Sequence, residues 1–408
     1  MKLSHIALRN IFRNGRRSLL SILAVALAAF AITFLFALFE GIKDDIMINA
    51  FRYESGEVRI RHSEFEKYEY LNPIQYTVED YAALLPGLEA LPGVSYVSPR
   101  INVNSAAFID DRQIPAVGLG LDIEREIRNM NIDELVVQGR LPRPGTTEAV
   151  LAGRLARDLG VEIGDRVTFL TQTRTRGSNA FTVDVVGIVS FSVGALNMRT
   201  YILPIESADR YLRMDGGASE LYVVGTGRNT QALHSEVQSF LDGFGNGSLS
   251  AVRWQLVSSG YAYIEFAGVV YNFIALFFFL LGSTVIINTT MMTIHERTKE
   301  IGTLSSLGMH KGELIRLFFT ESVYLGFFGS LAGVLLGTAV IIPVSSIGID
   351  MGTAMDIVDM GISSVLYPRL NVRSTVGTFF FSFVVAIAAS FLPARRAAKL
   401  KPVDALRG

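Results

Sequence analysis

Four long apolar segments constrain this chain more than any other feature of its sequence. They occupy residues 19–42, 264–294, 317–342 and 375–392, and they hold almost no charge. Crossing about 30 Å of hydrocarbon takes roughly 20 apolar residues in a helix. Backbone groups in lipid must also be satisfied within the chain, so each segment is predicted to be a transmembrane helix. The first segment is longer than the roughly 7–15 apolar residues of a signal peptide, which favours a retained anchor.

The basic residues near these segments predict the orientation in the membrane. Lysine and arginine gather before the first segment, between the second and third, and after the fourth, at Lys2, Arg9, Arg13, Arg16, Arg17, Arg297, Lys299, Lys311, Arg316, Arg395, Arg396, Lys399, Lys401 and Arg407. We therefore expect the N-terminal segment 1–18, the loop 295–316 and the tail 393–408 in the cytosol. Residues 43–263 and the short loop 343–374 are expected outside. Four buried helices of a soluble protein would not produce this alternation.

Composition excludes several classes of function. Charged residues make up 18% of the chain, against about a quarter in a typical soluble domain, and the net charge of −1 offers no basic surface for nucleic acid. The chain has no cysteine, which excludes disulfides, thiolate metal sites and cysteine nucleophiles. Its five histidines are scattered, with neither HExxH nor GxSxG motifs. We expect a non-catalytic chain that binds no metal or cofactor of its own.

The region 43–263 is long enough for one large domain, and its pattern predicts an α+β fold. Alternating or β-rich runs predict strands at 57–61, 94–103, 113–121, 149–151, 166–170, 181–191, 200–203 and 220–225. Helical spacing appears at 78–91, 153–159, 205–212 and 231–241. The flanking segments 41–50 and 254–265 are expected to continue the first two membrane helices as a stalk, with an ordinary linker as the alternative.

The loop 295–316 carries the most informative pattern. The charged run from Glu296 to Glu300 follows the second apolar segment, and Gly302 and Gly308 interrupt what comes next. This pattern predicts a short helix on the membrane surface, which could dock into a cytosolic partner and pass force to the membrane helices. From these residues alone, a solvated loop remains the simpler interpretation.

The same stretch resembles the FtsX/MacB/LolC-LolE family of ABC transporter permeases. That family carries an E-R-x-x-E-I-G-x-x-x-x-x-G segment, which is matched here by Glu296, Arg297, Glu300, Ile301, Gly302 and Gly308. The ends at 7–13 and 393–407 and the carboxylate Glu321 are also similar. The resemblance implies a coupling helix that contacts an ATPase, and a MacB-like periplasmic domain between the first two membrane helices. Residues 56–61 and those after them resemble the lipoprotein-releasing LolC/LolE branch most.

The resemblance also implies the partners. The sequence has no GxxxxGK[ST] phosphate loop, so ATP and Mg²⁺ are expected on a separate ABC ATPase, present in two copies. A second permease, identical or related, completes the assembly in a bacterial inner membrane. The expected function is the release of an acylated lipoprotein from the membrane lipid. Two alternatives stay open: export of a peptide or hydrophobic compound from the periplasm, and an FtsX-like scaffold that regulates a cell-wall hydrolase.

Two further sets of membrane residues are candidates for specific roles. Gly329, Gly333 and Gly337 lie on one face of the third helix, where small residues allow close packing within one subunit or between two. Apolar residues near the outer ends of the first two helices are candidates for contact with a lipid-modified substrate, namely Phe36, Phe39, Ile42, Ile46, Tyr263, Phe266 and Val270. Ordinary packing or lipid contact is the alternative for all seven. Glu321 is either functional or a helix-end cap.

Overall fold

The computed structural model describes residues 3–13, 15–69, 73–109, 112–227, 229–244, 247–306, 309–352 and 361–397. They divide into two compact units. The helical unit comprises residues 1–43, 265–349 and 366–408, and the sheet unit comprises residues 44–264 and 350–365.

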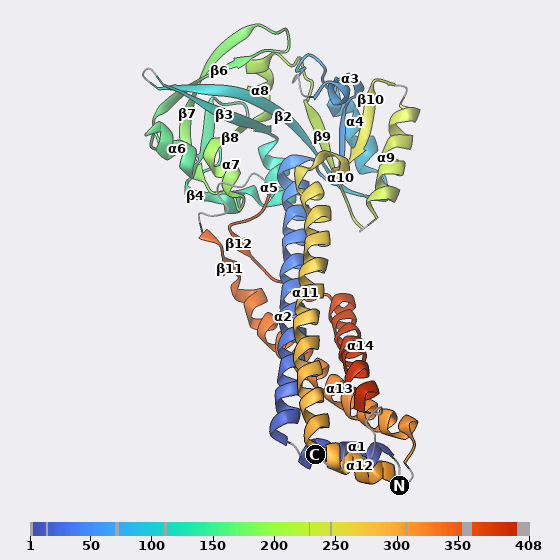
Figure 1. The fold of residues 1–408 in the computed structure, drawn as a ribbon. Helices are drawn as coiled ribbons and strands as arrows, with labels where there is room; N and C mark the ends of the chain where they lie inside the picture. Colours follow the sequence, from blue (N-terminus) through green and yellow to red (C-terminus); the bar gives the residue numbers. More distant parts are fainter. Residues whose placement is uncertain are drawn as a thin grey trace. The chain divides into compact units, whose positions relative to one another are not determined.

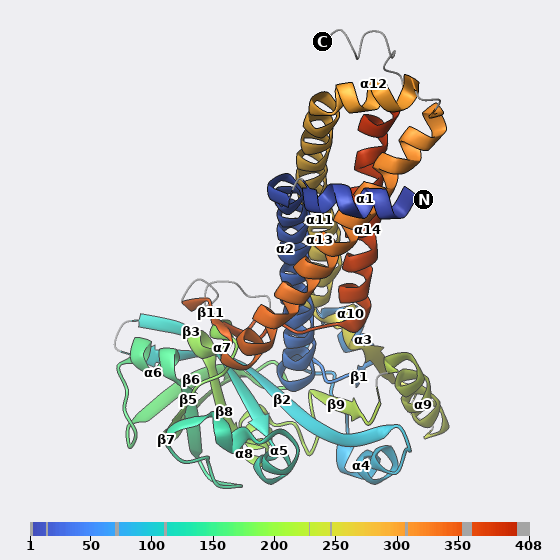
Figure 2. The same cartoon turned by 90° about the horizontal axis from the view of Figure 1, so that it is seen from below.

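The helical unit contains the four apolar segments as helices, which confirms the predicted class of a multi-pass membrane protein. Its helices are α1 (Leu3–Arg13), α2 (Gly15–Asn49), α11 (Ser259–Glu296), α12 (Thr298–Ser306), α13 (Lys311–Ile347) and α14 (Val372–Ala397). Within the described parts of the chain, the four helices that are apolar and long enough to cross a membrane are α2, α11, α13 and α14. Helices α2 and α11 run side by side (Figures 1 and 2), joined by the Ser21–Thr289 hydroxyl hydrogen bond of 2.9 Å.

Among its described residues, the sheet unit is built on one mixed sheet of ten strands. Its strands are β1 (Val58–His62), β2 (Val94–Ile109), β3 (Arg112–Leu121), β4 (Val136–Gly139), β5 (Glu148–Ala152), β6 (Arg166–Gln172), β7 (Ser178–Val189), β8 (Thr200–Pro204), β9 (Glu220–Gly225) and β10 (Leu249–Arg253). Their order is β10-β1-β9-β2-β3-β8-β5-β7-β4, and β6 pairs with β2 and β7. The β3–β8 and β5–β7 pairs are parallel, and the other pairs are antiparallel.

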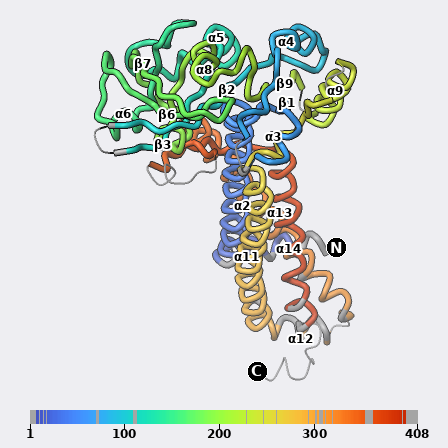
Figure 3. Tube along the Cα trace, turned by 90° about the horizontal axis from the view of Figure 1, so that it is seen from above, coloured from blue at the N-terminus to red at the C-terminus, as the bar shows by residue number. Residues whose placement is uncertain are grey.

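The long strand β2 takes part in two separate cores. Val94 and Val97 lie in a core closed by α4 (Tyr81–Glu89) and α9 (Thr230–Gly243). Ile101 and Val103 lie in a second core with residues of α6 (Gly153–Leu159) and α8 (Ile205–Leu212). Figure 3 shows α4 and α9 together on one side of the unit, and α6 with β6 and β7 on the other. One sheet therefore joins the two cores, and strand β2 contributes residues to both of them. The unit is an α+β domain.

Most predicted elements are present, and α6, α8 and β9 have the predicted bounds. The short elements β4, β10, α5 (Ile123–Met130) and α7 (Gly194–Arg199) were not predicted, because so few residues show little periodicity. The predicted short loop 343–374 is more structured than expected. Its described residues 350–352 and 361–365 belong to the sheet unit, and it forms the strand pair β11 (Ile349–Asp350) and β12 (Val365–Leu366).

The two stalk segments differ from each other. Helix α2 continues to Asn49 and ends in the π-helical turn η1 (Ala50–Glu54), as expected for a stalk. On the return side the helix is interrupted. The short helix α10 (Trp254–Val257) ends at Ser258, whose backbone is extended, and α11 begins at the next residue. The prediction of an unbroken helix over 254–265 is therefore wrong at Ser258.

Candidate functional site

The chain turns sharply between α11 and α12. Helix α11 ends at Glu296, and α12 begins at Thr298 after a single intervening residue, Arg297. Among the described side chains of α12, Lys299, Thr303 and Ser306 are exposed. Their spacing of four and three residues places them on one face of the helix. The structure thus presents a short helix with a polar face open to a partner.

Arg297 anchors this turn to α13, about three turns in from the start of that helix. Its guanidinium Nη1 lies 3.6 Å from Oε2 of Glu321, and both side chains are buried at about a tenth exposed or less. Removing one member of a buried ion pair leaves an uncompensated charge, so such a pair holds its two segments in one arrangement. Sequence reasoning named both residues, and the structure adds that they contact each other.

A small apolar cluster joins the ends of three helices in the same unit. Ile294 of α11, Leu314 of α13 and Ala394 of α14 pack together, with Met309 against them. Helix α13 begins with a capping box, in which the backbone N–H of His310 donates to Glu313 Oε2 at 3.0 Å. The ends of three membrane helices therefore meet next to α12. Histidine is an uncommon capping residue, so the sequence did not signal this box.

The predicted coupling residues fall around the turn. Glu296 is the last residue of α11 and is exposed, and Gly302 is buried on α12. Glu300 and Ile301 lie on α12 as well. Gly308 lies outside the described residues.

The three glycines of α13 face α2 of the same chain. A Cβ atom added at Gly333 would lie 2.3 Å from the backbone oxygen of Ala26. An added Cβ would lie 2.6 Å from Val25 Cβ at Gly329, and 3.0 Å from Thr33 Cβ at Gly337. In the structure, each of these glycines packs against α2 within one chain.

The seven candidate substrate-contacting residues do not share one open surface. Ile42 and Ile46 are buried, Phe36 packs against the cluster of Ile32, Ala275 and Phe279, and Tyr263 is half-buried. The ring of Phe39 lies 4.7 Å from that of Tyr271, centroid to centroid. Phe266 and Val270 are exposed, at 70% and 38%. Phe36 and Phe39 therefore serve packing between α2 and α11, which the sequence could not distinguish from an exposed apolar face.

Within the sheet unit, the end of α2 is bound to the sheet. The Tyr222 hydroxyl of β9 donates to the backbone oxygen of Glu54 in η1 at 2.8 Å. The Ser258 hydroxyl donates to Glu54 Oε2 at 2.7 Å, and Arg100 of β2 donates to the backbone oxygen of Arg52 at 3.3 Å. Residues near the start and near the end of the segment 44–264 therefore meet at η1. A π-turn at such a junction often marks a functional site.

A buried charge network lies on the same face of the sheet. Arg61 Nε donates to Glu220 Oε2 at 2.5 Å, and Arg59 Nη2 donates to Glu66 Oε2 at 2.9 Å. Burial, aided by the Glu220 carboxylate, raises the pKa of Tyr222 well above its usual value. Burial opposes ionisation of Glu69, but Arg59 and Arg61 hold its pKa below the usual value. In the sequence these arginines alternate with apolar residues, which predicts solvent-facing side chains, so the network was missed.

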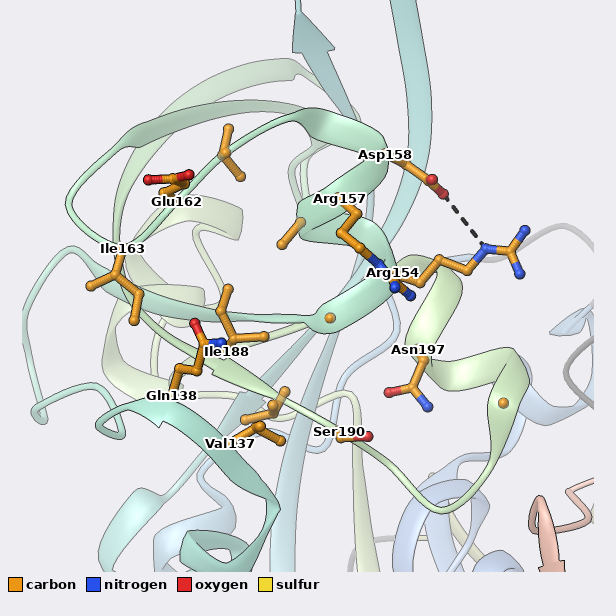
Figure 4. Close-up of a pocket in the computed structure, with 15 residues that line it drawn as sticks. Val137, Gln138, Arg154, Arg157, Asp158, Glu162, Ile163, Ile188, Ser190 and Asn197 are labelled. Carbon is orange, nitrogen blue, oxygen red and sulfur yellow. Dashed lines mark ion pairs between the residues drawn. The ribbon is translucent and has the colours of Figure 1, made fainter. Parts of the chain in front are cut away.

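The sheet unit also contains an open hollow of about 1040 Å³ beside β4. Figure 4 shows Val137 and Gln138 on one side of it, Glu162 and Ile163 on a second, and α6 on a third. Arg154 and Asp158 of α6 form an exposed ion pair with 3.9 Å between Nε and Oδ2. Nothing in this lining resembles a catalytic set, and within the described part of the chain no three His, Asp or Glu side chains are grouped to hold a metal ion.

Comparison with known families matches both parts of the chain. Residues 18–240, more than half of the chain, match the family described as MacB-like periplasmic core domain. Residues 272–402 match the family described as FtsX-like permease C-terminal. The second match contains α12, the ion pair of Arg297 with Glu321, and the glycines of α13.

Curated relatives are similar over parts of their length. An uncharacterized ABC transporter permease of Methanocaldococcus jannaschii is 30% identical over 229 residues, 55% of this chain and 54% of that protein. The pyoverdine export ATP-binding/permease protein PvdT of Pseudomonas syringae pv. tomato is 33% identical over 31% of this chain and 17% of that protein. The macrolide export ATP-binding/permease protein MacB of Neisseria gonorrhoeae is 33% identical over 33% of this chain and 18% of that protein. The chain spans about half or less of the length of these relatives.

Two solved structures are similar to about half of this chain. The extracellular domain of the noncanonic ABC-type transporter YknZ from Gram-positive bacteria has a TM-score of 0.34 at 14% identity, covering 48% of this chain and 99% of that chain. The periplasmic region of MacB from Actinobacillus actinomycetemcomitans has a TM-score of 0.34 at 12% identity, covering 49% of this chain and 89% of that chain.

Proposed function

Because this chain belongs to the family of ABC transporter permeases with a MacB-like periplasmic core domain, we propose that it couples ATP hydrolysis by a separate ATPase to mechanical work outside the membrane. Such permeases are generally non-catalytic. The 408 residues contain no phosphate-loop motif, so the proposal assigns ATP and Mg²⁺ to the partner ATPase.

The observation that carries this proposal is the structure around α12. A helix of nine residues presents the polar side chains of Lys299, Thr303 and Ser306, and the buried pair of Arg297 with Glu321 ties its base to α13. A partner that moves α12 therefore moves α11 and α13 with it. Packed helices transmit such displacements because close-packed interfaces shift between discrete arrangements instead of deforming.

The route outward from this region is one continuous helix. Helix α2 has 35 residues and reaches about 50 Å at 1.5 Å per residue. It packs against the α13 glycines in the helical unit, and its continuation η1 is hydrogen-bonded to β9 and β2 in the sheet unit. Movement of α13 can therefore pass to α2, whose chain continues through η1 into the sheet unit.

The alternation of basic residues supports the direction of this route. In this proposal α12 and both termini lie in the cytosol and the sheet unit lies outside, with the chain in the inner membrane of a bacterium. The partners in this proposal are two copies of an ABC ATPase and a second permease, which is either identical to this chain or related to it.

For the cargo, export of a peptide or hydrophobic compound from the outer side of the membrane is the first candidate. Two similar proteins are named as exporters, of pyoverdine and of macrolides. Release of an acylated lipoprotein is the second candidate. It is supported by the exposure of Phe266 and Val270, but it loses the support of Ile42 and Ile46, which are buried.

The test begins with the ATPase interface. In the full chain, Lys299→Glu with Thr303→Glu should weaken association with the ATPase by about tenfold or more, because opposing charge at the rim of an interface is costly. Membrane insertion should be unchanged. The matched control is Arg373→Glu, which reverses an exposed charge at the start of α14. Equal ATPase binding by both variants would contradict the assigned role of α12.

The cargo is then identified with the complex in proteoliposomes. ATPase activity stimulated by a macrolide or a short peptide supports export. ATP-dependent transfer of an acylated lipoprotein to a soluble acceptor supports lipoprotein release. Binding of a cell-wall hydrolase without either activity would support an FtsX-like regulatory scaffold instead.

A further inference from the structure

One face of α2 carries small and polar residues at intervals of four. Ala37, Gly41, Asp45 and Asn49 follow one another along the same side of the helix, one turn apart. Each contacts a residue of the segment 361–369, which we call the strap. The strap follows α13 and leads into α14 at Val372.

In the helical unit the strap lies directly on the backbone of α2. The backbone N–H of Arg369 donates to the carbonyl oxygen of Ala37 at 2.8 Å. A Cβ atom added at Gly41 would lie 2.3 Å from the carbonyl oxygen of Tyr367, which no side chain can occupy without displacing the strap. Glycine at position 41 is therefore what permits the close approach.

In the sheet unit the strap is held by charged and polar groups. The Asp45 carboxylate accepts two hydrogen bonds from Ser363, from its backbone N–H and from its hydroxyl, each of 2.7 Å. Asn49 Nδ2 donates to the carbonyl oxygen of Gly361 at 2.8 Å. Hydrogen bonds to an ionised carboxylate are about twice as strong as neutral ones. Ser363 and its neighbour Ile362 are both buried.

The same part of the strap also bonds to the sheet unit beyond α2. The backbone N–H of Ser364 donates to the carbonyl oxygen of Ser192 at 3.1 Å, in the segment between β7 and α7. Met351, on the α13 side, donates its backbone N–H to the carbonyl oxygen of Ser364 at 2.9 Å. The strap therefore touches α2, the segment before α7, and the chain that leaves α13.

We infer that the strap is a second mechanical connection, which stays fastened to α2 through the transport cycle and carries displacement of α13 and α14 to the sheet unit. This inference rests on the proposed function. A connection of this kind explains why a half-buried carboxylate and a mid-helix glycine, which is unfavourable in a helix, occur on the face that the strap covers.

The first experiment measures whether the strap is fastened, and it needs no transport activity. The chain has no native cysteine, so Ile362→Cys is a unique reporter in the full chain in membranes. A membrane-impermeant maleimide should label it slowly. Adding Gly41→Ala or Asp45→Ala should speed labelling by about tenfold or more, because the buried segment then opens more often. The control Gly377→Ala, which has open space around the added Cβ, should leave the rate unchanged.

Equal labelling rates with and without Gly41→Ala and Asp45→Ala would overturn the inference. Failure of the ATPase to bind the chain would instead contradict the proposed function, and the labelling result would still report on the strap. The two failures are therefore separable.

The second experiment asks whether the strap must stay fastened. Asp45→Cys with Ser363→Cys places two thiols where the native side chains are in contact. In the complex with its ATPase, the reduced double variant should lose most ATP-driven export, and disulfide formation should restore it. Basal ATP hydrolysis should be equal in both forms. Export that stops on oxidation and resumes on reduction would mean that the strap opens during the cycle, and would overturn the inference.

Discussion

Glycine at position 333 sets how closely α13 approaches α2. The nearest backbone atom of α2 would lie 2.3 Å from an added Cβ, so the two helix backbones are in direct contact there. In lipid, helix association depends on packing and not on the hydrophobic effect, so small residues at such a contact have a large effect on stability.

We predict that Gly333→Ala lowers the stability of the detergent-solubilised chain by about 1–3 kcal/mol, the usual cost of overpacking a close contact. Gly377→Ala adds the same methyl group to α14 with no atom within 4 Å, and should be neutral or slightly stabilising because alanine favours helix. Thermal unfolding of both variants tests this. A Gly333→Ala chain as stable as Gly377→Ala would contradict the packing role.

The interactions of Glu148 make the stability of the sheet unit depend on pH. Hydrogen bonds from Arg140, including one of 2.7 Å to Oε2, together with the backbone N–H of Arg143, lower the pKa of Glu148 to about 2. A carboxylate with a lowered pKa stabilises the fold above its unfolded pKa near 4.5, and this contribution is lost as the pH falls toward 2.

Glu148→Gln should therefore lower the free energy of unfolding at pH 7 and have a smaller effect at pH 3. Urea unfolding followed by the fluorescence of Trp254, the single tryptophan and a buried residue of the sheet unit, measures the difference. The exposed Glu162→Gln is the control and should change stability little at either pH. A Glu148→Gln effect that grows on acidification would refute the assignment.

At the scale of the element, β1 shows how a strand can be buried on both faces. Val58 and Ile60 face the core closed by α4 and α9, while Arg59 and Arg61 face a second buried layer that contains Glu220 of β9. Alternation of apolar and polar residues ordinarily indicates one buried and one solvated face. The ion pairs across β1 and β9 are what allow the polar face to be covered.

We predict that Arg61→Met destabilises the sheet unit by about 3 kcal/mol. The substitution leaves the buried charge of Glu220 without this ion-pair partner. Arg61→Met with Glu220→Met should recover most of the loss, since methionine fills both sites without charge. Chemical unfolding of the single and double variants gives the coupling between them. A double variant that loses as much as the sum of the singles would show that the pair does not act as a unit.

The element bounds show which patterns the sequence carries. Helices α6 and α8 and strand β9 match their predicted ranges because apolar spacing and flanking glycine or proline mark them. The path of residues 361–364 was not predictable, because their hydrogen bonds are to Asp45, Asn49 and Ser192, each more than 150 positions away in the chain.

At the scale of the whole molecule, the distribution of basic residues predicts a topology that can be measured directly. Lys299→Cys on α12 should be protected from a membrane-impermeant maleimide in intact cells and become reactive after permeabilisation. Glu162→Cys in the sheet unit should react in both. Both native side chains are exposed, so protection reports the side of the membrane and not burial. Labelling of Lys299→Cys in intact cells would contradict the cytosolic place of α12.

The sequence by itself determined the class of this protein. Four apolar runs of membrane length, the alternation of basic flanks and the motif from Glu296 to Gly308 are local properties, which depend on the identity and spacing of neighbouring residues. The mixed helix and strand pattern of the region 43–263 is local in the same sense.

Only the tertiary structure decided how those parts are used. It placed the α13 glycines against α2, joined Arg297 to Glu321, buried Ile42 and Ile46, and laid the strap along α2. Each of these depends on which distant residue meets a given side chain. Burial and pairing energies belong to contacts and not to single residues, and the contacts form only when the chain has folded.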